Sequence, residues 1–446
     1  MMISAPALIE SLSDKAEACA SVGFGPDLFK RWNTAQPAAA ARLAGGLDLR
    51  ARVVIGRHDR RASMLDRAGR SMAGLNFSSM DYLGLSSHET ITAATVRAAQ
   101  KLPLASGGTA AMTGLSPQLL ALERRVADSL GLADATVFAS GWQALQAATA
   151  TLLGRNDHAI IDMNAHPALK AGARLAGATV HTFPHASLEG VERRLSRLRR
   201  AEPGAGLMVA TSALFPTTAT VADLIGLVEI CAAYRATLLV DVAHDFGAVG
   251  QRGLGVAELQ GLVSRIDIVV GSFAKTFGSN GGFVASRNTP FQLALRLGGA
   301  GQSQSAALSP LQAAVILAAF DVVFSPDGAR RRARLMANSL RLRNRLVVEG
   351  FHVLGQPGPL VSVMLQGGLF ARAMTAEAAR RGILVNLLES PHVPRHAPRW
   401  RLQLMSEHTM ADIDRLAEVA VTARALLGTG QVGAAPVFMP TGFAGL

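Results

Sequence analysis

The sequence predicts an α/β fold with more than one domain. Two short aliphatic runs, 236–240 and 266–270, are typical of buried strands. A third stretch, 135–147, has the pattern of a strand, a tight turn and a helix. With 446 residues, 49% of them apolar and 17% charged, the chain is long enough and apolar enough for a large core.

Cysteine use and hydropathy limit where the protein works. Cys19 and Cys231 are too few for a disulfide framework, which fits a reducing cytoplasm. The first 20 residues lack a basic segment leading into an apolar one, so they do not resemble a signal peptide. No apolar run approaches the ~20 residues of a membrane span. We therefore expect a cytoplasmic protein with no membrane span.

The net charge of +12 comes mostly from arginines in two bursts, 193–200 and 330–345. Both bursts carry leucine at helical spacing, which is typical of the solvated face of a helix. A nucleic-acid surface would interleave aromatic residues with the charge, and aromatics are only 5% of the chain. We therefore expect no nucleic-acid partner. A basic surface would also attract an anionic carrier such as coenzyme A or acyl carrier protein, and the sequence does not choose between them.

Lys275 follows the run 266–270 in an apolar setting bounded by glycines. An unpaired buried ammonium is costly, so a lysine in such a place is expected to use its amine. Burial lowers the pKa of the amine, and condensation with an aldehyde removes the charge. Pyridoxal phosphate (PLP) is the common biological aldehyde, and the hydroxyl of Ser272 suits its phosphate. The sequence therefore predicts that Lys275 holds PLP as a Schiff base, and it indicates no metal site.

The segment 272–275 also matches the S-x-x-K motif of penicillin-binding enzymes. Those enzymes carry S-D-N and K-T-G motifs and work outside the cytoplasm. The chain has neither motif in the required context, so this alternative is disfavoured.

Asp241 ends the run 236–240, at a position where α/β enzymes place ligand-binding residues. A carboxylate against the pyridine nitrogen of PLP keeps the ring protonated, so that it can absorb electrons from the substrate. His244, three residues on, is placed to donate to the phenolate oxygen of the ring. The alternative for Asp241 is a helix N-cap followed by an unrelated histidine.

Two motifs, VDVAHDFGAVGQRGLGVAE from residue 240 and IDIVVGSFAKTFGSNGGFV from residue 266, resemble the α-oxoamine synthase family of fold-type I PLP-dependent enzymes. The similarity runs from about residue 76 to about residue 416. This family includes 8-amino-7-oxononanoate synthase, 5-aminolevulinate synthase, serine palmitoyltransferase and autoinducer synthases. The resemblance implies a large domain with a mostly parallel sheet, a small α/β C-terminal domain and a homodimer with shared active sites.

The phosphate of PLP is expected at the start of a helix, where Gly141 and Trp142 offer free backbone N–H groups. The family resemblance implies that His166 stacks on the ring and that Ser305 reaches the phosphate of the partner subunit. It also implies that Arg401 receives the carboxylate of the amino acid, which a guanidinium fork fits with two bonds. We interpret His185, at the place of a second family histidine, as structural.

The chain departs from the family pattern at several supporting positions. These departures put the substrate in doubt more than the chemistry. They are Met80, Ala110, Leu119, Thr211, Phe215, Val242 and Ala306.

The sequence divides into four parts. We expect a helical N-terminal segment over 1–75, a large PLP-binding domain over 76–320, a small domain over 321–428 and a flexible tail over 429–446. The tail is rich in glycine, alanine and proline.

The predicted activity is that of a PLP-dependent acyltransferase. It condenses glycine, alanine or serine with an acyl thioester, usually with loss of CO2, to give an α-amino ketone. An aminotransferase or a lyase on the same fold is the alternative. A non-catalytic partner subunit is a further one, and it is disfavoured because Lys275, Asp241, His244 and His166 are all present.

Overall fold

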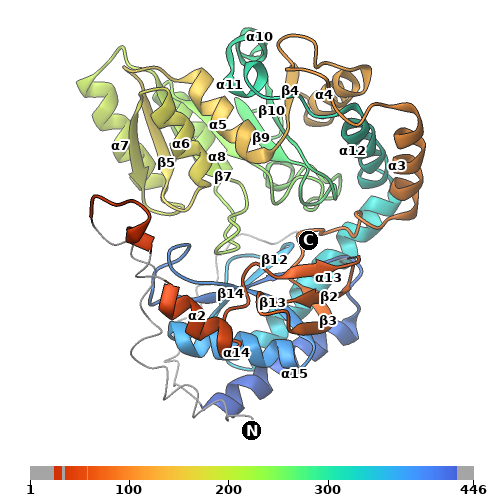
Figure 1. The fold of residues 1–446 in the computed structure, drawn as a ribbon. Coiled ribbons are helices and arrows are strands. Elements are labelled where there is room, and N and C mark those ends of the chain that lie inside the picture. The colour runs from red at the N-terminus through yellow and green to blue at the C-terminus, as the bar shows by residue number, and fades with distance from the viewer. Residues whose placement is uncertain (1–24, 33–35, 58, 429–446) are drawn as a thin grey trace.

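The computed structural model describes residues 25–32, 36–57 and 59–428, which form two layered units (Figure 1). Each unit is built around a seven-stranded sheet. The upper unit in Figure 1 holds the middle of the chain, and the lower unit joins the two ends of the described chain.

The sheet of the large unit is mostly parallel, as predicted. Every pairing that involves β10 is antiparallel, and the other pairings are parallel. In spatial order the strands are β4 (Asp134–Phe138), β10 (Gly282–Ser286), β9 (Ile268–Ser272), β8 (Thr237–Asp241), β7 (Leu207–Ser212), β5 (His158–Asp162) and β6 (Thr179–Phe183).

The central strands of this sheet are buried along their whole length. All residues of β5, β7, β9 and β10 are buried, and since side chains alternate between faces, both faces must be covered. The covering and connecting helices are α3 (Glu89–Lys101), α4 (Pro117–Leu130), α5 (Gly141–Leu152), α6 (Pro167–Leu175), α7 (Leu188–Ala201), α8 (Leu224–Ala233), α9 (Val256–Leu259), α10 (Thr289–Gly298), α11 (Ala300–Ser303) and α12 (Pro310–Val323).

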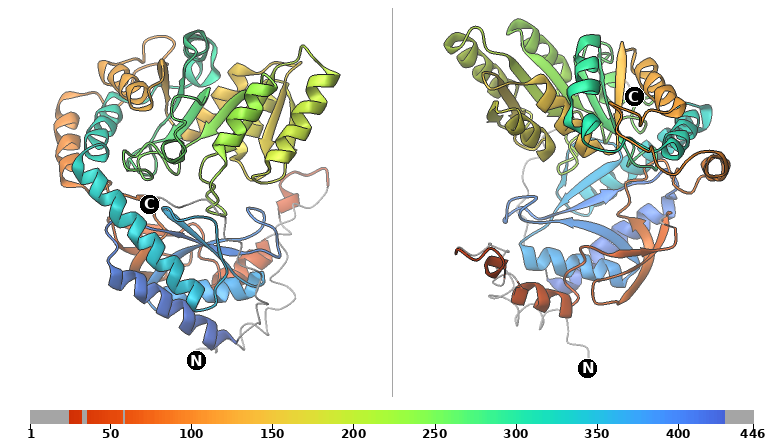
Figure 2. Two further views of the ribbon diagram at one scale, coloured as in Figure 1. Left: turned by 180° about the vertical axis from the view of Figure 1, so that it is seen from behind. Right: turned by 45° about the horizontal axis from the view of Figure 1, so that its top comes forward.

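The sheet of the small unit combines strands from both ends of the chain, which lie side by side in Figure 2. The order is β1 (Val53–Ile55), β2 (Arg61–Leu65), β3 (Ser71–Phe77), β13 (Ile383–Leu388), β14 (Arg399–Gln403), β12 (Leu360–Met364) and β11 (Val353–Leu354). The pair β3–β13 is parallel, and the other pairs are antiparallel. Its helices are η1 (Lys30–Trp32), α2 (Gln36–Ala44), α13 (Pro326–Val348), α14 (Gly368–Arg380) and α15 (Met410–Leu427).

The expectation of a helical segment over 1–75 is wrong for its second half, where β1, β2 and most of β3 lie. In β2 the residues alternate between exposed and buried, with Ala62 and Met64 inward. This alternation is the pattern of a strand with one face on a core. Arg61, the arginine of β2, lies on the exposed face of this strand. Residues 1–24 and the expected flexible tail over 429–446 lie outside the described residues.

No single helix of the described chain is long and apolar enough to cross a membrane. The helices α12 and α13 meet that description only when taken together, and they are bent by 73° at their junction.

His408 ties the two ends of the chain together inside the small unit. Its ring stacks on Phe77 of β3 with centroids 4.1 Å apart. Its Nδ1 accepts the N–H of Met405 at 3.0 Å, and its Nε2 lies 3.1 Å from the carbonyl of Asn76. Burial lowers the pKa of His408 from 6.5 to about 4, although Asp412 and the Asn76 carbonyl oppose the shift.

This shift predicts a pH-dependent loss of stability. Because the folded pKa of His408 lies below the unfolded value, the unfolded chain binds a proton that the fold excludes, and stability falls as the pH falls from 6.5 toward 4. The contribution of His408 to the free energy of unfolding should drop by about 2 kcal/mol between pH 7 and pH 5. Chemical denaturation at both pH values measures this drop. The free energy of unfolding of His408→Gln should change by about 2 kcal/mol less between pH 7 and pH 5 than that of the wild type. Substitution of the exposed His352 by Gln is the control, and equal pH dependence in His408→Gln and the wild type would contradict the prediction.

Candidate active site

The predicted catalytic residues meet at one edge of the large sheet. Asp241 is the last residue of β8, and Lys275 lies three residues beyond β9. These two strands are parallel neighbours, with Asp241 opposite Val270, so their carboxyl ends reach the same edge. Electrostatic interactions link Lys275 to Asp241, His166 and His244.

Asp241 is a buried carboxyl group that forms no salt bridge among the described residues. Its Oδ1 accepts the N–H of Ala243 at 3.0 Å. Burial raises the pKa of Asp241 above 3.8, whereas the nearby Lys275 amine and the hydrogen bond from Ala243 lower it. A buried carboxylate is stabilised by an N–H⁺ donor at close range, and the protonated ring nitrogen of PLP is such a donor. The site around Asp241 therefore fits the cofactor.

Lys275 is half-buried, and its amine shifts toward the neutral form. Burial lowers the pKa of Lys275 from 10.5, and the Arg401 guanidinium lowers it further, while Asp241 opposes the shift. A neutral amine is the form that attacks an aldehyde. The location of Lys275 therefore agrees with the predicted Schiff base.

Two histidines flank this pair. His244 is buried, and burial lowers its pKa well below 6.5, with Lys275, Arg401 and His166 adding to the shift. Its Nδ1 lies 2.7 Å from the hydroxyl of Tyr82. His166 caps the start of α6, and the Trp142 ring meets it edge-on with centroids 5.4 Å apart.

The start of α5 lies against β9 closely enough to require glycine. A Cβ atom on Gly141 would lie 2.8 Å from Cβ of Ser272, and one on Gly282 would lie 2.6 Å from Cα of Gly141. Ser140 caps the helix by accepting the N–H of Gln143, so the N–H groups of the first helical residues stay available. With the hydroxyl of Ser272, they form a cradle that fits a phosphate group.

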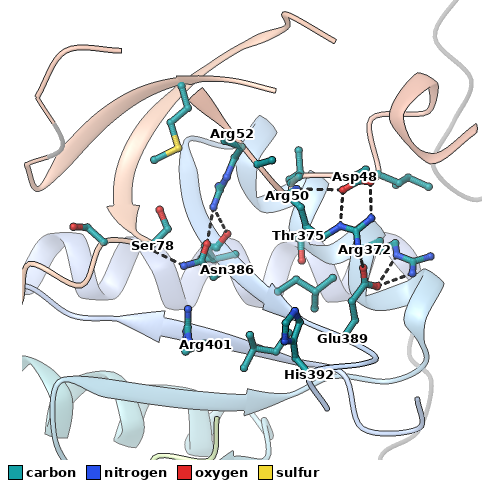
Figure 3. Close-up of a pocket in the computed structure, with 18 of the residues that line it drawn as sticks. Asp48, Arg50, Arg52, Ser78, Arg372, Thr375, Asn386, Glu389, His392 and Arg401 are labelled. Carbon is teal, nitrogen blue, oxygen red and sulfur yellow. Dashed lines mark hydrogen bonds and ion pairs between the residues drawn. The ribbon is translucent and has the colours of Figure 1, made fainter. Parts of the chain in front are cut away.

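Arg401 lines a cavity of about 510 Å³ in the small unit (Figure 3). Its guanidinium has no hydrogen-bond or ion-pair partner among the described residues, and its Nε is buried. Asn386 pairs in register with Arg401 and accepts a 2.7 Å hydrogen bond from Arg52. Burial lowers the pKa of Arg401 from 12.5. An unpaired guanidinium at the wall of a cavity fits a carboxylate ligand.

Among the described residues, no hydrogen bond joins Ser305 or His185 to the groups of this cluster. Ser305 is half-buried just beyond α11, and in the described single chain no hydrogen bond connects it to Lys275 or Ser272. Its predicted role therefore depends on a second subunit. His185 lies 3.2 Å from Asp162 and packs edge-on against Phe215, which agrees with a structural role.

Tyr82 and Arg52 are site residues that sequence reasoning missed. Tyr82 lies near the start of the range 76–416 over which the chain resembles the family, and a fully buried tyrosine requires a partner for its hydroxyl. Because the chain contains only two tyrosines, Tyr82 could have been recognised from the sequence as a candidate site residue. Arg52 lies in the N-terminal part that was expected to be helical, which concealed its place beside the cavity.

Comparisons with known proteins identify the family of this chain. Residues 73–419 match the family model "Aminotransferase class I and II". The 8-amino-7-oxononanoate synthase of Geobacter metallireducens is 32% identical over 355 residues, which cover 79% of this chain and 88% of that protein. The serine palmitoyltransferase structure of Sphingomonas wittichii matches with a TM-score of 0.84 at 27% identity, over 90% of this chain and 99% of the other. A structure of SPT with PLP matches with a TM-score of 0.84 at 27% identity, over the same shares.

The fold, the lysine–aspartate pair and the family model define a PLP-dependent enzyme of fold type I, in the aminotransferase class I and II group. Within that group, the chain belongs to the α-oxoamine synthase family.

The lowered pKa of Lys275 predicts how the cofactor-free protein takes up PLP. The neutral amine is the reactive form, and a lower pKa makes more of it at a given pH. The rate of PLP uptake, followed by visible absorption, should therefore rise with pH and then level off. The midpoint of this rise should lie below pH 10.5. Lys275→Ala should develop no Schiff-base absorption. The helix-surface variant Lys101→Ala should behave as the wild type, and a midpoint at or above 10.5 would refute the assignment.

Proposed function

We propose that this protein joins a small amino acid to an acyl thioester, releases CO2 and yields an α-amino ketone. The observation that carries the proposal is the unpartnered guanidinium of Arg401 beside the Lys275–Asp241 pair. This arrangement offers one site for a carboxylate and one amine at the same place. The named activities of the relatives, 8-amino-7-oxononanoate synthase and serine palmitoyltransferase, support the same reaction class.

The residues divide the work by position. Arg401 holds the substrate carboxylate with two hydrogen bonds and so fixes the amino acid relative to Lys275. Lys275, with its pKa lowered, accepts the α-proton on Nζ as a general base. Asp241 would hold the ring nitrogen of PLP, His244 would donate to the oxygen of the ring, and His166 would cover its face. Bound PLP supplies the electron-withdrawing ring that makes this proton acidic.

The cavity beside Arg401 has room for more than the amino acid. Part of its wall is apolar and is formed by Val54, Met64 and Leu387. We assign this part to the acyl group, whose thioester must approach the α-carbon. The choice of coenzyme A or acyl carrier protein as the carrier is left open by this wall.

A homodimer is part of the proposal. The phosphate cradle of Gly141, Trp142 and Ser272 lies on one chain, and among the described residues no hydrogen bond joins Ser305 to Ser272. A second copy that contributes Ser305 would complete the cradle. We also propose a cytoplasmic location, in keeping with the biosynthetic names of the relatives.

An aminotransferase is the second candidate, favoured by the match to the aminotransferase class I and II model. It would use the same Lys275 and Asp241 but would release a keto acid and consume no thioester. Product analysis with and without acyl-CoA separates the two activities. An amino ketone formed only with the thioester supports the condensation, and a keto acid formed without it supports the alternative.

Titration of the PLP-loaded enzyme with glycine, alanine and serine should identify the amino substrate. One of them should shift the visible absorption band at a concentration where the others do not. Arg401→Ala should weaken the binding of that amino acid at least tenfold, because the loss of a charge-assisted hydrogen bond costs about 1.5–3 kcal/mol. Arg395→Ala, which removes an exposed arginine of the same unit, is the control. If none of the three amino acids shifts the visible absorption band, the result would count against the proposal.

A further inference from the structure

We propose that Tyr82 is a positioning residue that fixes the tautomer of His244. The phenol of Tyr82 donates its proton to Nδ1 of His244, and Nε2 therefore carries the ring proton and acts as the donor in the active site. The inference rests on the proposed function, which assigns His244 to the ring oxygen of PLP.

The contact is short, buried and held from both sides. The hydroxyl of Tyr82 lies 2.7 Å from Nδ1 of His244, although the two residues are 162 positions apart. The Tyr82 side chain is fully buried. Its backbone is fixed too, because its N–H donates to Met80 and its carbonyl accepts the N–H of Ser406. Tyr82 therefore meets His244 from a rigid position.

The direction of the bond follows from the number of protons. A phenol has one proton to donate, and a neutral imidazole has one N–H and one acceptor nitrogen. Among the described residues, His244 Nδ1 is the only hydrogen-bond partner of the Tyr82 hydroxyl. If Nδ1 carried the proton, the buried phenol hydrogen would point at no acceptor, which is costly. The phenol is therefore the donor.

Burial keeps both partners neutral. Lys275, Arg401 and His166 face His244, and burial together with these groups lowers the pKa of His244 well below 6.5. Burial raises the pKa of Tyr82 well above its usual value of 10. Asp245 adds to this shift and Arg401 opposes it. The arrangement of one phenol donor and one neutral imidazole therefore holds throughout the neutral pH range.

Nε2 is then the free end of His244. Nε2 has no hydrogen-bond partner among the described residues. It is also not fully buried, so a ligand can reach it. A fixed N–H there donates to the ring oxygen of PLP, and a fixed donor is worth more than one that must first change tautomer. Without Tyr82 the imidazole is free to carry its proton on Nδ1, which turns Nε2 into an acceptor.

The direct test is ¹⁵N nuclear magnetic resonance of histidine in the cofactor-free protein. The His244 signal, assigned by its absence in His244→Gln, should show a protonated Nε2 and an unprotonated Nδ1 in the wild type. Tyr82→Phe should shift both nitrogens toward a mixture of tautomers. Tyr234→Phe, which changes the other tyrosine of the chain, should leave them as in the wild type. A protonated Nδ1 in the wild type overturns the proposal, and this measurement stands even if Tyr82→Phe fails to fold.

The second readout uses the PLP-loaded enzyme. The pH at which the absorption of bound PLP titrates should shift in Tyr82→Phe, and kcat should fall about tenfold with little change in KM for the amino acid. Unchanged titration and kcat in a folded Tyr82→Phe would also overturn the proposal. If PLP does not bind to the wild type, the proposed function fails, whereas the tautomer of His244 in the cofactor-free protein is unaffected.

Discussion

The electrostatic pairing of Lys275 with Asp241 is the constraint on which the site depends. Each group alone would be an expensive buried charge, and each shifts the pKa of the other toward ionisation. Burial opposes ionisation of both groups, so it outweighs the effect that each has on the pKa of the other. The amine is thus kept close to its reactive form, and the carboxyl group is prepared for a cationic ring. The remaining residues adjust this balance: Arg401 favours the neutral amine, and the neutral His244 adds no charge of its own.

The sheet supplies the distances that this pairing needs. Because β8 and β9 are adjacent and parallel, a residue at the end of one and a residue shortly after the other reach the same edge without any long-range adjustment. The glycines at the start of α5 let a helix N-terminus approach the same edge. The small unit then brings Arg401 from the other side. The site is therefore a contact between two sheets, one of which holds the reactive groups and the other the substrate.

The sequence was informative where the site is local and uninformative where it is assembled over long distances. Lys275, Asp241 and His244 lie at or just beyond the ends of short aliphatic runs, so the sequence indicates that each follows a buried strand, and the chemistry of PLP together with the family resemblance predicts that they act together. Tyr82 could not be paired with His244 in this way, since their contact spans 162 residues. The strands β1 to β3 were taken for helix because the N-terminal segment is rich in alanine and leucine. The inward alternation of β2 has meaning only once β13 lies beside β3. Ser305 differs again, because its predicted role requires a second subunit.

The parallel pairing of β3 with β13 has a consequence for how the protein is made. Leu75 and Ile383 are register partners, so more than 300 residues must be synthesised between the two halves of this ladder. The large unit can form while β3 still lacks that neighbour, because domains generally fold as units during synthesis. Loop closure over such a separation is slow, and an unpaired strand edge invites wrong partners. The cavity that holds Arg401 and Arg52 takes shape only when this late closure is complete. A nascent or truncated chain could therefore carry the lysine–aspartate pair and still have no place for a substrate.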